Sequence, residues 1–228
     1  MATEKQLRHL GIICDGNRRW AKERGLPTLE GHLSGFERVK LLVDAFLPTE
    51  IEFMSFFLFS TENWGRSETE VNYLMQLVRT KLPSLIKKLE KNNLRLAVMG
   101  RPDPVDPKLW ASLMEAEERT AKNTGKTVAI CFNYGGQWEI VDAANRAIAR
   151  GEPILDPADF AKNLYHPEIP ACDVIARTSG EQRISGFQLW RAAYAEFMFL
   201  DKFFPALETS DLDSILDEFH GRQRRFGK

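Results

Sequence analysis

Short runs of apolar residues recur along this chain, and longer segments with an amphipathic pattern separate them. Several runs are almost continuously apolar, as expected for strands of a parallel sheet that is covered on both faces. The runs predict strands at residues 9–14, 52–59, 94–99, 127–133, 173–177 and 195–199.

The segments between these runs carry apolar residues at the three-or-four spacing of an amphipathic helix. The longest, 69–92, contains Pro83, which we expect to bend the helix or to open a gap in its hydrogen bonds. Further helices are predicted from near Asn17 and at residues 34–46, 106–123, 137–150, 156–164, 187–193 and 211–222. Alternating strands and helices predict an α/β fold, a single domain of residues 1–228 with a central, mainly parallel six-stranded sheet flanked by helices.

Composition narrows the class of protein. The chain has 228 residues, 43% hydrophobic and 28% charged, with a formal net charge of -1, so its overall charge predicts neither a nucleic-acid nor a membrane-surface partner. The cysteines Cys14, Cys131 and Cys172 are odd in number and form no Cys-x-x-Cys pair, which favours buried thiols in a reducing compartment. The first residues are polar, and the longest apolar stretch, 51–60, is too short to span a bilayer. We therefore expect a cytoplasmic protein.

Candidate chemistry begins with the run Cys14-Asp15-Gly16-Asn17-Arg18-Arg19-Trp20, directly after the first predicted strand. Ligands of open α/β sheets bind beyond the carboxyl ends of the strands. This end offers a carboxylate for a metal, a glycine, an amide and two guanidinium groups, and the free N–H groups of the following helix would face the same loop. Together they suit a Mg²⁺–diphosphate. The alternative is ordinary Asp-Gly-Asn turn chemistry with two solvated arginines.

Further polar clusters follow other predicted strands or lie near their ends. Gly31-His32 and residues 60–66, 133–136 and 177–185 are these clusters, and each also has a plain interpretation as a structural histidine, a capped loop, a tight turn or a mixed-charge surface loop. Glu196 lies inside an apolar segment, where a carboxylate is uncommon unless it is paired or bound to a metal. No P-loop or Gly-x-Gly-x-x-Gly fingerprint is present.

The chain resembles the cis-prenyltransferases, the undecaprenyl diphosphate synthase family. The motifs Asp-Gly-Asn-x-Arg-Trp-Ala, Gly-His, Phe-Ser-Thr-Glu-Asn-Trp-x-Arg, Asn-Tyr-Gly-Gly, Arg-Thr-x-Gly-Glu-x-Arg-Ile-Ser and Tyr-Ala-Glu occur in that order over almost the whole chain. The resemblance implies the fold of that family, with an apolar tunnel between the sheet and the long helix. It also implies a homodimer and a Mg²⁺-dependent enzyme that condenses isopentenyl diphosphate with an allylic diphosphate to give a Z-polyprenyl diphosphate.

The resemblance assigns roles residue by residue. Asp15 would hold Mg²⁺ on the allylic diphosphate, and Glu196 would be a second Mg²⁺-linked carboxylate. The allylic diphosphate would be bound by the loop Gly16, Asn17, Arg18, Arg19 and Trp20 and by the neighbouring His32. Ser60 and Asn63 would lie near the reacting carbons, and Trp64 and Arg66 would belong to the loop that closes over the substrates. Isopentenyl diphosphate would be bound by Arg177, Arg183 and Ser185, and Arg225 and Gly227 would reach the neighbouring subunit. Asp15, Asn17, His32, Ser60 and Asn63 are the implied catalytic residues.

Two departures from the family pattern bear on function. Thr28 stands where the family usually has an arginine on the allylic diphosphate, and Ser179 replaces a common glycine. Leu58 and Phe132 stand where undecaprenyl-type members often have small residues, and close-packed interiors leave little room for the added volume. A shallower tunnel predicts a short product, of farnesyl size or a few units longer. Smaller neighbours such as Val78 and Thr80 could instead compensate.

A few members of the family join two allylic units irregularly to give branched products, but they depart from the Asp-Gly-Asn loop or the isopentenyl site, and this chain keeps both. Three alternatives stay open. One is an undecaprenyl diphosphate synthase that serves a cell-wall lipid carrier, and another is a non-catalytic partner subunit, against which the presence of Asp15, Asn17, Arg19 and Glu196 argues. The third is an unrelated phosphate-binding protein of Rossmann type. The preferred allylic starter, the proton acceptor, the pathway and any peripheral membrane contact during product release are left open by the sequence.

Overall fold

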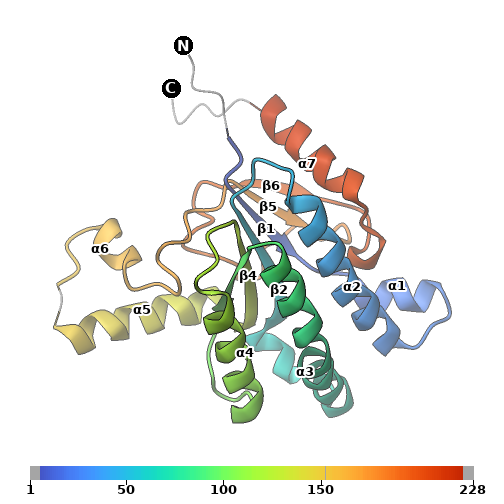
Figure 1. Ribbon diagram of the computed structural model, residues 1–228, viewed down its shortest axis with the longest axis horizontal. Coiled ribbons are helices and arrows are strands. Elements are labelled where there is room, and N and C mark those ends of the chain that lie inside the picture. The colour runs from blue at the N-terminus through green and yellow to red at the C-terminus, as the bar shows by residue number, and fades with distance from the viewer. Residues whose placement is uncertain (1–5, 152, 223–228) are drawn as a thin grey trace.

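The computed structural model describes residues 6–151 and 153–222, and its centre is one sheet of six parallel strands. The strand order is β3-β4-β2-β1-β5-β6 (Figure 1). The strands are β1 His9–Ile13, β2 Phe53–Ser60, β3 Arg95–Met99, β4 Thr127–Tyr134, β5 Val174–Arg177 and β6 Glu196–Phe199. All the predicted strands are confirmed, with ends that differ by at most one residue.

Strands β1 and β4 are buried along their whole length. Every residue of β1 and of β4 is buried, and β1 lies between β2 and β5 with Ile13 opposite both Phe57 and Arg177. A strand with helices or packed chain on both faces needs apolar side chains in both directions, which is why these segments show no alternation.

The helices follow the predicted pattern, with differences at several of their ends and with one predicted helix absent. They are α1 Asn17–Glu23, α2 Thr28–Phe46, α3 Glu68–Lys91, α4 Pro107–Thr120, α5 Gly136–Arg150, α6 Pro157–Ala161 and α7 Thr209–Gly221, with short 3₁₀ helices η1 Thr61–Gly65 and η2 Phe204–Ala206. Helix α3 continues through Pro83. Helix α2 begins six residues before the predicted position, and Gly31 within it packs against α1, where a Cβ would lie 2.1 Å from the Asn17 carbonyl oxygen.

The helix predicted at residues 187–193 is wrong. Residues 185–194 form consecutive turns instead. Gln188 has φ +51° and Gly186 has φ +76°, and left-handed residues interrupt a right-handed helix. The segment is nonetheless apolar on its inner side, because Phe187 is fully buried and stacks on Phe57 of β2 with ring centroids 4.9 Å apart.

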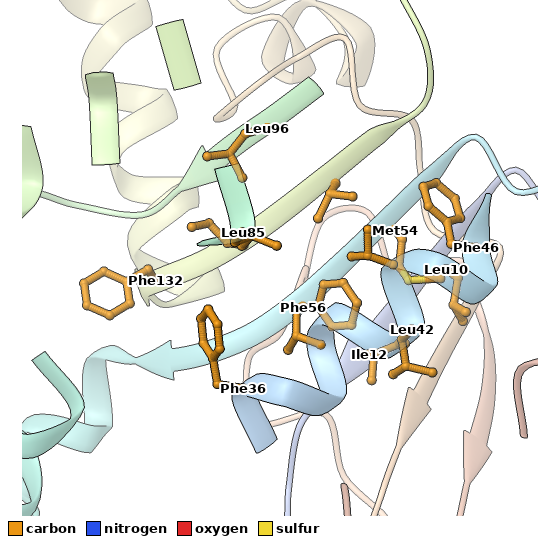
Figure 2. Close-up of a cluster of buried hydrophobic side chains, with 14 of the residues drawn as sticks. Leu10, Ile12, Phe36, Leu42, Phe46, Met54, Phe56, Leu85, Leu96 and Phe132 are labelled. Carbon is orange, nitrogen blue, oxygen red and sulfur yellow. The ribbon is translucent and has the colours of Figure 1, made fainter. Parts of the chain in front are cut away.

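The two faces of the sheet have different covers. Helices α2, α3, α4 and α7 cover one face and form the larger core, part of which Figure 2 shows around Phe36, Phe56 and Phe132. The other face packs against the turns of residues 185–194 and the segment around Ile169 and Cys172. In Figure 1, α5 and α6 extend to the left, away from α1, α2 and α7 on the right. No helix in the described part of the chain is long and apolar enough to cross a bilayer.

The order of the strands creates a switch point between β1 and β5. The chain leaves β1 toward β2 on one side, whereas β5 is followed by β6 on the other side. At such a point the connections diverge and open a crevice beyond the carboxyl ends of the strands. Asp15 follows β1 and Arg177 ends β5, so the fold brings the first predicted functional residue to this crevice.

Candidate active site

A cavity of about 900 Å³ opens at the carboxyl ends of β1, β2 and β5. Its volume lies within the range of about 300–1,000 Å³ that is typical of small-molecule sites. The predicted site residues that line it are Asp15, Gly16, Asn17, Arg18, Arg19, His32, Leu58, Ser60, Asn63, Arg66, Arg177, Arg183 and Ser185. The structure therefore gathers residues from loops that are up to 170 positions apart in the sequence.

Asp15 is fixed by the end of β5. One carboxylate oxygen accepts a hydrogen bond of 2.8 Å from the Arg177 guanidinium, and the other accepts one of 2.6 Å from the Gly16 N–H. The Asp15 N–H donates to the Thr178 hydroxyl at 2.9 Å. Burial alone would raise the pKa of the Asp15 carboxyl, but the Arg177, Gly16 and Arg19 contacts outweigh burial and leave that pKa below its ordinary value. The carboxylate is thus ionised at neutral pH.

Arg177 is a buried cation at the floor of the crevice. Only 4% of the residue is exposed, and its guanidinium also donates to the Ser185 hydroxyl at 2.9 Å and to the Arg183 carbonyl at 2.6 Å. Its Nε is buried and has no hydrogen-bond partner. These two hydrogen bonds hold the loop 178–186 against the Arg177 side chain and so position Arg183 and Ser185.

Arg19 connects the loop between β1 and α1 to the loop after β5. Its guanidinium lies 3.6 Å from the Asp15 carboxylate, 3.1 Å from the Glu181 carboxylate and 2.6 Å from the Ser179 hydroxyl. Ser179, which departs from the family pattern, has φ +76°, yet its hydroxyl supplies an acceptor that glycine lacks. Glu181 also pairs with Arg183 at 2.5 Å. Two carboxylates thus face three guanidinium groups on this side of the cavity, which leaves one positive charge in excess.

The start of α1 is built by close packing. Gly16 has φ +95°, and a Cβ there would lie 2.6 Å from the Phe203 ring, so the turn into α1 requires glycine. Asn17 donates to the Cys14 carbonyl at 3.3 Å, while its Oδ1 is buried without a partner. Thr28, the other departure, begins α2 in an exposed position and does not line the cavity.

Glu70, at the start of α3, is a functional candidate that sequence reasoning missed. Its carboxylate lies 3.1 Å from the His32 ring, 2.8 Å from Arg66 and 3.5 Å from Arg18. The residue is only 8% exposed. Its spacing after Ser67, whose hydroxyl accepts from the Glu70 N–H, reads in the sequence as an ordinary helix cap. Its position four residues after Arg66 is the signal in the sequence that could have indicated an ion pair at the start of α3.

Two guanidinium groups and one imidazole on the α1–α2–α3 side therefore surround one buried carboxylate. Burial lowers the pKa of His32, although the Glu70 contact opposes that effect, so the imidazole is mainly neutral at pH 7. A diphosphate that entered this part of the cavity would find Arg18 and Arg66 already placed. Glu70 would be the group with which the diphosphate competes.

The loop after β2 is held by its own caps and by β4. The Ser60 N–H donates to the Asn63 side chain at 3.1 Å, and the Ser60 side chain accepts from the Asn63 backbone in return. Trp64 donates from its ring nitrogen to the Asn133 side chain at 2.8 Å, and the edge of its ring meets Phe59. Ser60 and Asn63 line the cavity, whereas Trp64 lies behind it.

Some predicted residues lie outside the cavity. Trp20 stacks with Arg24 on the outer side of α1, with 4.5 Å between the guanidinium carbon and the ring centroid. Phe132 is 1% exposed and packs on Phe59 behind the cavity wall. Arg225 and Gly227 lie outside the described residues.

Within one copy of the chain, Glu196 and Asp15 lie at opposite ends of the strands, and the implied role of Glu196 as a second Mg²⁺-linked carboxylate stays a prediction. Glu196 opens β6 opposite Val174, three positions before the level of Arg177, and its carboxylate bonds to Arg222 at 3.0 Å. Three residues along a strand span about 10 Å, and Asp15 lies beyond the far end. The Tyr-Ala-Glu motif therefore places its carboxylate at the amino-terminal end of the edge strand β6.

The chemistry of the donor set fits a magnesium ion at Asp15. Mg²⁺ is usually held by one or two carboxylates together with substrate phosphates and water, not by a cage of protein ligands. The described residues contain no group of three or more acidic, histidine or cysteine side chains arranged for a metal. Asp15 offers an ionised, partly exposed carboxylate beside cations that would bind phosphate oxygens.

Comparison with known proteins agrees with this site. Residues 13–227 match the family described as "Putative undecaprenyl diphosphate synthase". The chain is 40% identical over 221 residues to an isoprenyl transferase of Neisseria gonorrhoeae, covering 97% of this chain and 89% of that protein. It is 41% identical over 231 residues to a ditrans,polycis-undecaprenyl-diphosphate synthase, (2E,6E)-farnesyl-diphosphate specific, of Vibrio vulnificus, covering 99% and 92%.

A solved structure of lavandulyl diphosphate synthase from Lavandula x intermedia, in complex with dimethylallyl diphosphate, superposes with a TM-score of 0.91. The two chains are 31% identical, and the match covers 97% of this chain and 98% of that one. A likeness of this extent in sequence and in fold, together with the arrangement of Asp15, Arg19 and Arg177, settles the family. The chain belongs to the undecaprenyl diphosphate synthase family of cis-prenyl transferases.

Proposed function

We propose that this enzyme condenses isopentenyl diphosphate with an allylic diphosphate in a Mg²⁺-dependent reaction and releases a short Z-polyprenyl diphosphate. The observation that carries the proposal is the ionised Asp15 carboxylate, bonded to buried Arg177 and flanked by Arg19 in one cavity. Metal and guanidinium groups stabilise a departing diphosphate, because negative charge develops where cations are already placed.

The two sides of the cavity support two diphosphate sites. Arg177, Arg183 and Ser185 surround one region, which we assign to isopentenyl diphosphate. Gly16, Asn17, Arg18, Arg19 and His32 surround the other, which we assign to the allylic diphosphate with Mg²⁺ on Asp15. A magnesium ion bound there would neutralise the leaving diphosphate. Ser60 and Asn63 also line the cavity, and we assign them to the region where the reacting carbons would meet.

The wall of the cavity supports a short product. Leu58 lines the cavity beside Leu74 of α3, and the pairing of β2 with β4 shifts register at Leu58. Such a bulge turns neighbouring residues toward the same face, so Leu58 and Phe59 both face α3. Phe59 and Phe132 fill the space behind, with ring centroids 5.5 Å apart. Extension toward the core would require these side chains to move.

Two alternatives to a short-chain enzyme require structural features that differ from those of this chain. An undecaprenyl product requires a deeper tunnel, and Phe36, Phe56 and Phe132 occupy that region of the core (Figure 2). A non-catalytic partner subunit does not require an ionised carboxylate between two arginines, which this chain retains. Neither alternative is favoured by an observation of its own.

We further propose that the chain acts as a single catalytic domain, residues 1–228, and works as a homodimer in the cytoplasm. The described cysteines are all free thiols, in keeping with a reducing compartment. Helix α5 and the segment after it expose Val141, Ile148, Ile154 and Leu155, an apolar surface suited to a second copy.

The test is a product assay. The purified chain is incubated with Mg²⁺, isopentenyl diphosphate and, separately, dimethylallyl, geranyl and farnesyl diphosphate, and the products are sized. We expect chains of three to about seven isoprene units, since close packing resists further growth. An undecaprenyl product would contradict the short-chain part of the proposal, and no condensation with any starter would overturn the assignment as an enzyme.

A further inference from the structure

A second cavity lies at the last turns of α5, whereas the first turn of α5 lines the active-site cavity. Its volume is about 280 Å³, and it shares no lining residue with the larger cavity. Arg146 and Arg150 line it from the last turns of α5, and Lys162, Tyr165 and His166 line it from the segment after α6. Arg146 is ten residues beyond Gly136 at the active-site end of α5, which is about 15 Å along a helix axis.

Arg146 has a donor that no described group satisfies. Its Nε donates to the Asn163 carbonyl at 2.8 Å, and its guanidinium lies over the Tyr165 ring, 4.8 Å from the centroid. Its Nη2 is buried and has no hydrogen-bond partner. A buried, charged N–H without an acceptor is costly, and guanidinium groups match the paired oxygens of phosphate and carboxylate ions. The arrangement therefore calls for an acceptor from outside the described residues.

The charges around this cavity favour an anion as that acceptor. Arg150 reaches the Asn163 side chain at 3.4 Å, and Lys162 pairs with Asp159 at 2.7 Å. His166 lies 3.1 Å from both Glu117 and Glu168, and those contacts, working against burial, raise the pKa of its ring. Asp142 accepts a hydrogen bond from the Tyr165 hydroxyl. The nearby carboxylates thus already contact other groups, and none of them contacts Arg146 in the described part of the chain.

We propose that this cavity is a second anion site, which binds inorganic phosphate or diphosphate through Arg146 with support from Arg150. The cavity lies at the small end of the range of ligand sites, which suits a small ion and excludes a prenyl chain. The inference does not rest on the proposed reaction, because it uses none of the residues of the catalytic cavity.

The test follows the Arg146 side chain directly. The full chain, isotope-labelled on nitrogen, is titrated with inorganic phosphate and separately with diphosphate at constant ionic strength, and the Nε–H resonance of Arg146 is recorded. Arg146→Lys identifies the resonance by its loss. We expect a saturable shift, with a midpoint raised about ten-fold or more in Arg150→Gln, since one charge-assisted hydrogen bond is lost.

Two controls separate this site from the catalytic cavity. Arg183→Gln, which removes a cation from the catalytic cavity, should leave the Arg146 midpoint within about two-fold, because distant sites act independently. Arg146→Gln should leave the prenyl transfer rate within about two-fold for the same reason. A shift that is absent, that chloride reproduces, or that follows Arg183→Gln as closely as Arg150→Gln would overturn the proposal.

Discussion

Asp15 is a residue whose environment determines its charge. Its folded pKa is lowered, so the pair with Arg177 contributes stability above the unfolded pKa of about 3.9 and loses it as pH falls through the lower folded value. Asp15→Asn keeps the shape and removes the charge. We expect prenyl transfer to fall by about 10²-fold or more, because the metal loses its carboxylate.

The stability of Asp15→Asn separates a catalytic from a structural role. Thermal unfolding should show a nearly constant difference from the wild type between about pH 5 and 8, and the difference should close below about pH 4. A variant that is folded at pH 7 but inactive supports the metal role. Full activity in Asp15→Asn would contradict it.

The buried ring of His9, at the start of β1, leads us to expect that the folded protein loses stability in acid. The ring is fully buried, lies 2.7 Å from the Ser55 hydroxyl and 2.8 Å from the Pro170 carbonyl, and burial lowers its pKa from 6.5 to about 4. A depressed histidine pKa means that stability is complete above pH 6.5 and falls as pH drops toward 4. The loss should reach about 3 kcal/mol at the lower end.

The measurement is urea unfolding at several pH values for the wild type and His9→Asn. Asparagine can still hydrogen-bond but does not titrate. Between pH 6.5 and 4, the free energy of unfolding of His9→Asn should therefore fall by about 3 kcal/mol less than that of the wild type. A matched control is His220→Asn, whose ring is exposed near Glu50. Equal slopes for wild type and His9→Asn would show that other groups cause the acid sensitivity.

At the scale of elements, Glu70 joins three helices, since it contacts Arg18 of α1, His32 of α2 and the approach to α3. Glu70→Gln leaves Arg66 and Arg18 without their shared carboxylate, which we expect to lower the free energy of unfolding by about 2 kcal/mol. Inorganic diphosphate should then raise the melting temperature of Glu70→Gln more than that of the wild type, because the ion replaces the lost charge. An equal or smaller rise would mean that Glu70 does not occupy a diphosphate site.

The bulge on β2 leads to a prediction about product length. Leu58 lines the cavity while Phe132 lies one layer behind it, so the two should respond differently to truncation. Leu58→Ala should lengthen the product by one or more isoprene units and cost about 1–2 kcal/mol. Phe132→Ala should cost about 3–5 kcal/mol, because its ring is fully packed.

Product sizing and urea unfolding of these two variants check the prediction. If Leu58→Ala leaves the product unchanged while Phe132→Ala lengthens it, the limiting wall is the deeper aromatic layer and not the bulge.

Much of the whole molecule could be predicted because parallel strands are apolar on both sides, and the carboxyl ends of β1, β2 and β5 therefore collect the polar loops. The apolar pattern of residues 187–193 predicts a helix, because the sequence does not indicate that Gln188 adopts φ > 0. Glu70 resembled a cap, and the motif around Glu196 carried no information about the edge of the sheet to which it belongs. Both depend on tertiary placement.

The apolar surface of α5 makes a final prediction about assembly. Ile148 is 75% exposed and Leu155 is 81% exposed, and large apolar side chains that cluster on one surface indicate an interface. Ile148→Asp places a charge there, and burial of an unpaired charge would weaken association by several kcal/mol. We expect a dimer for the wild type and a monomer for Ile148→Asp in sedimentation at micromolar concentration. Leu26→Asp, an exposed apolar position beyond α1, is the matched control and should remain dimeric. If both variants sediment like the wild type, α5 is not the interface; if activity falls only in Ile148→Asp, each site depends on its neighbour.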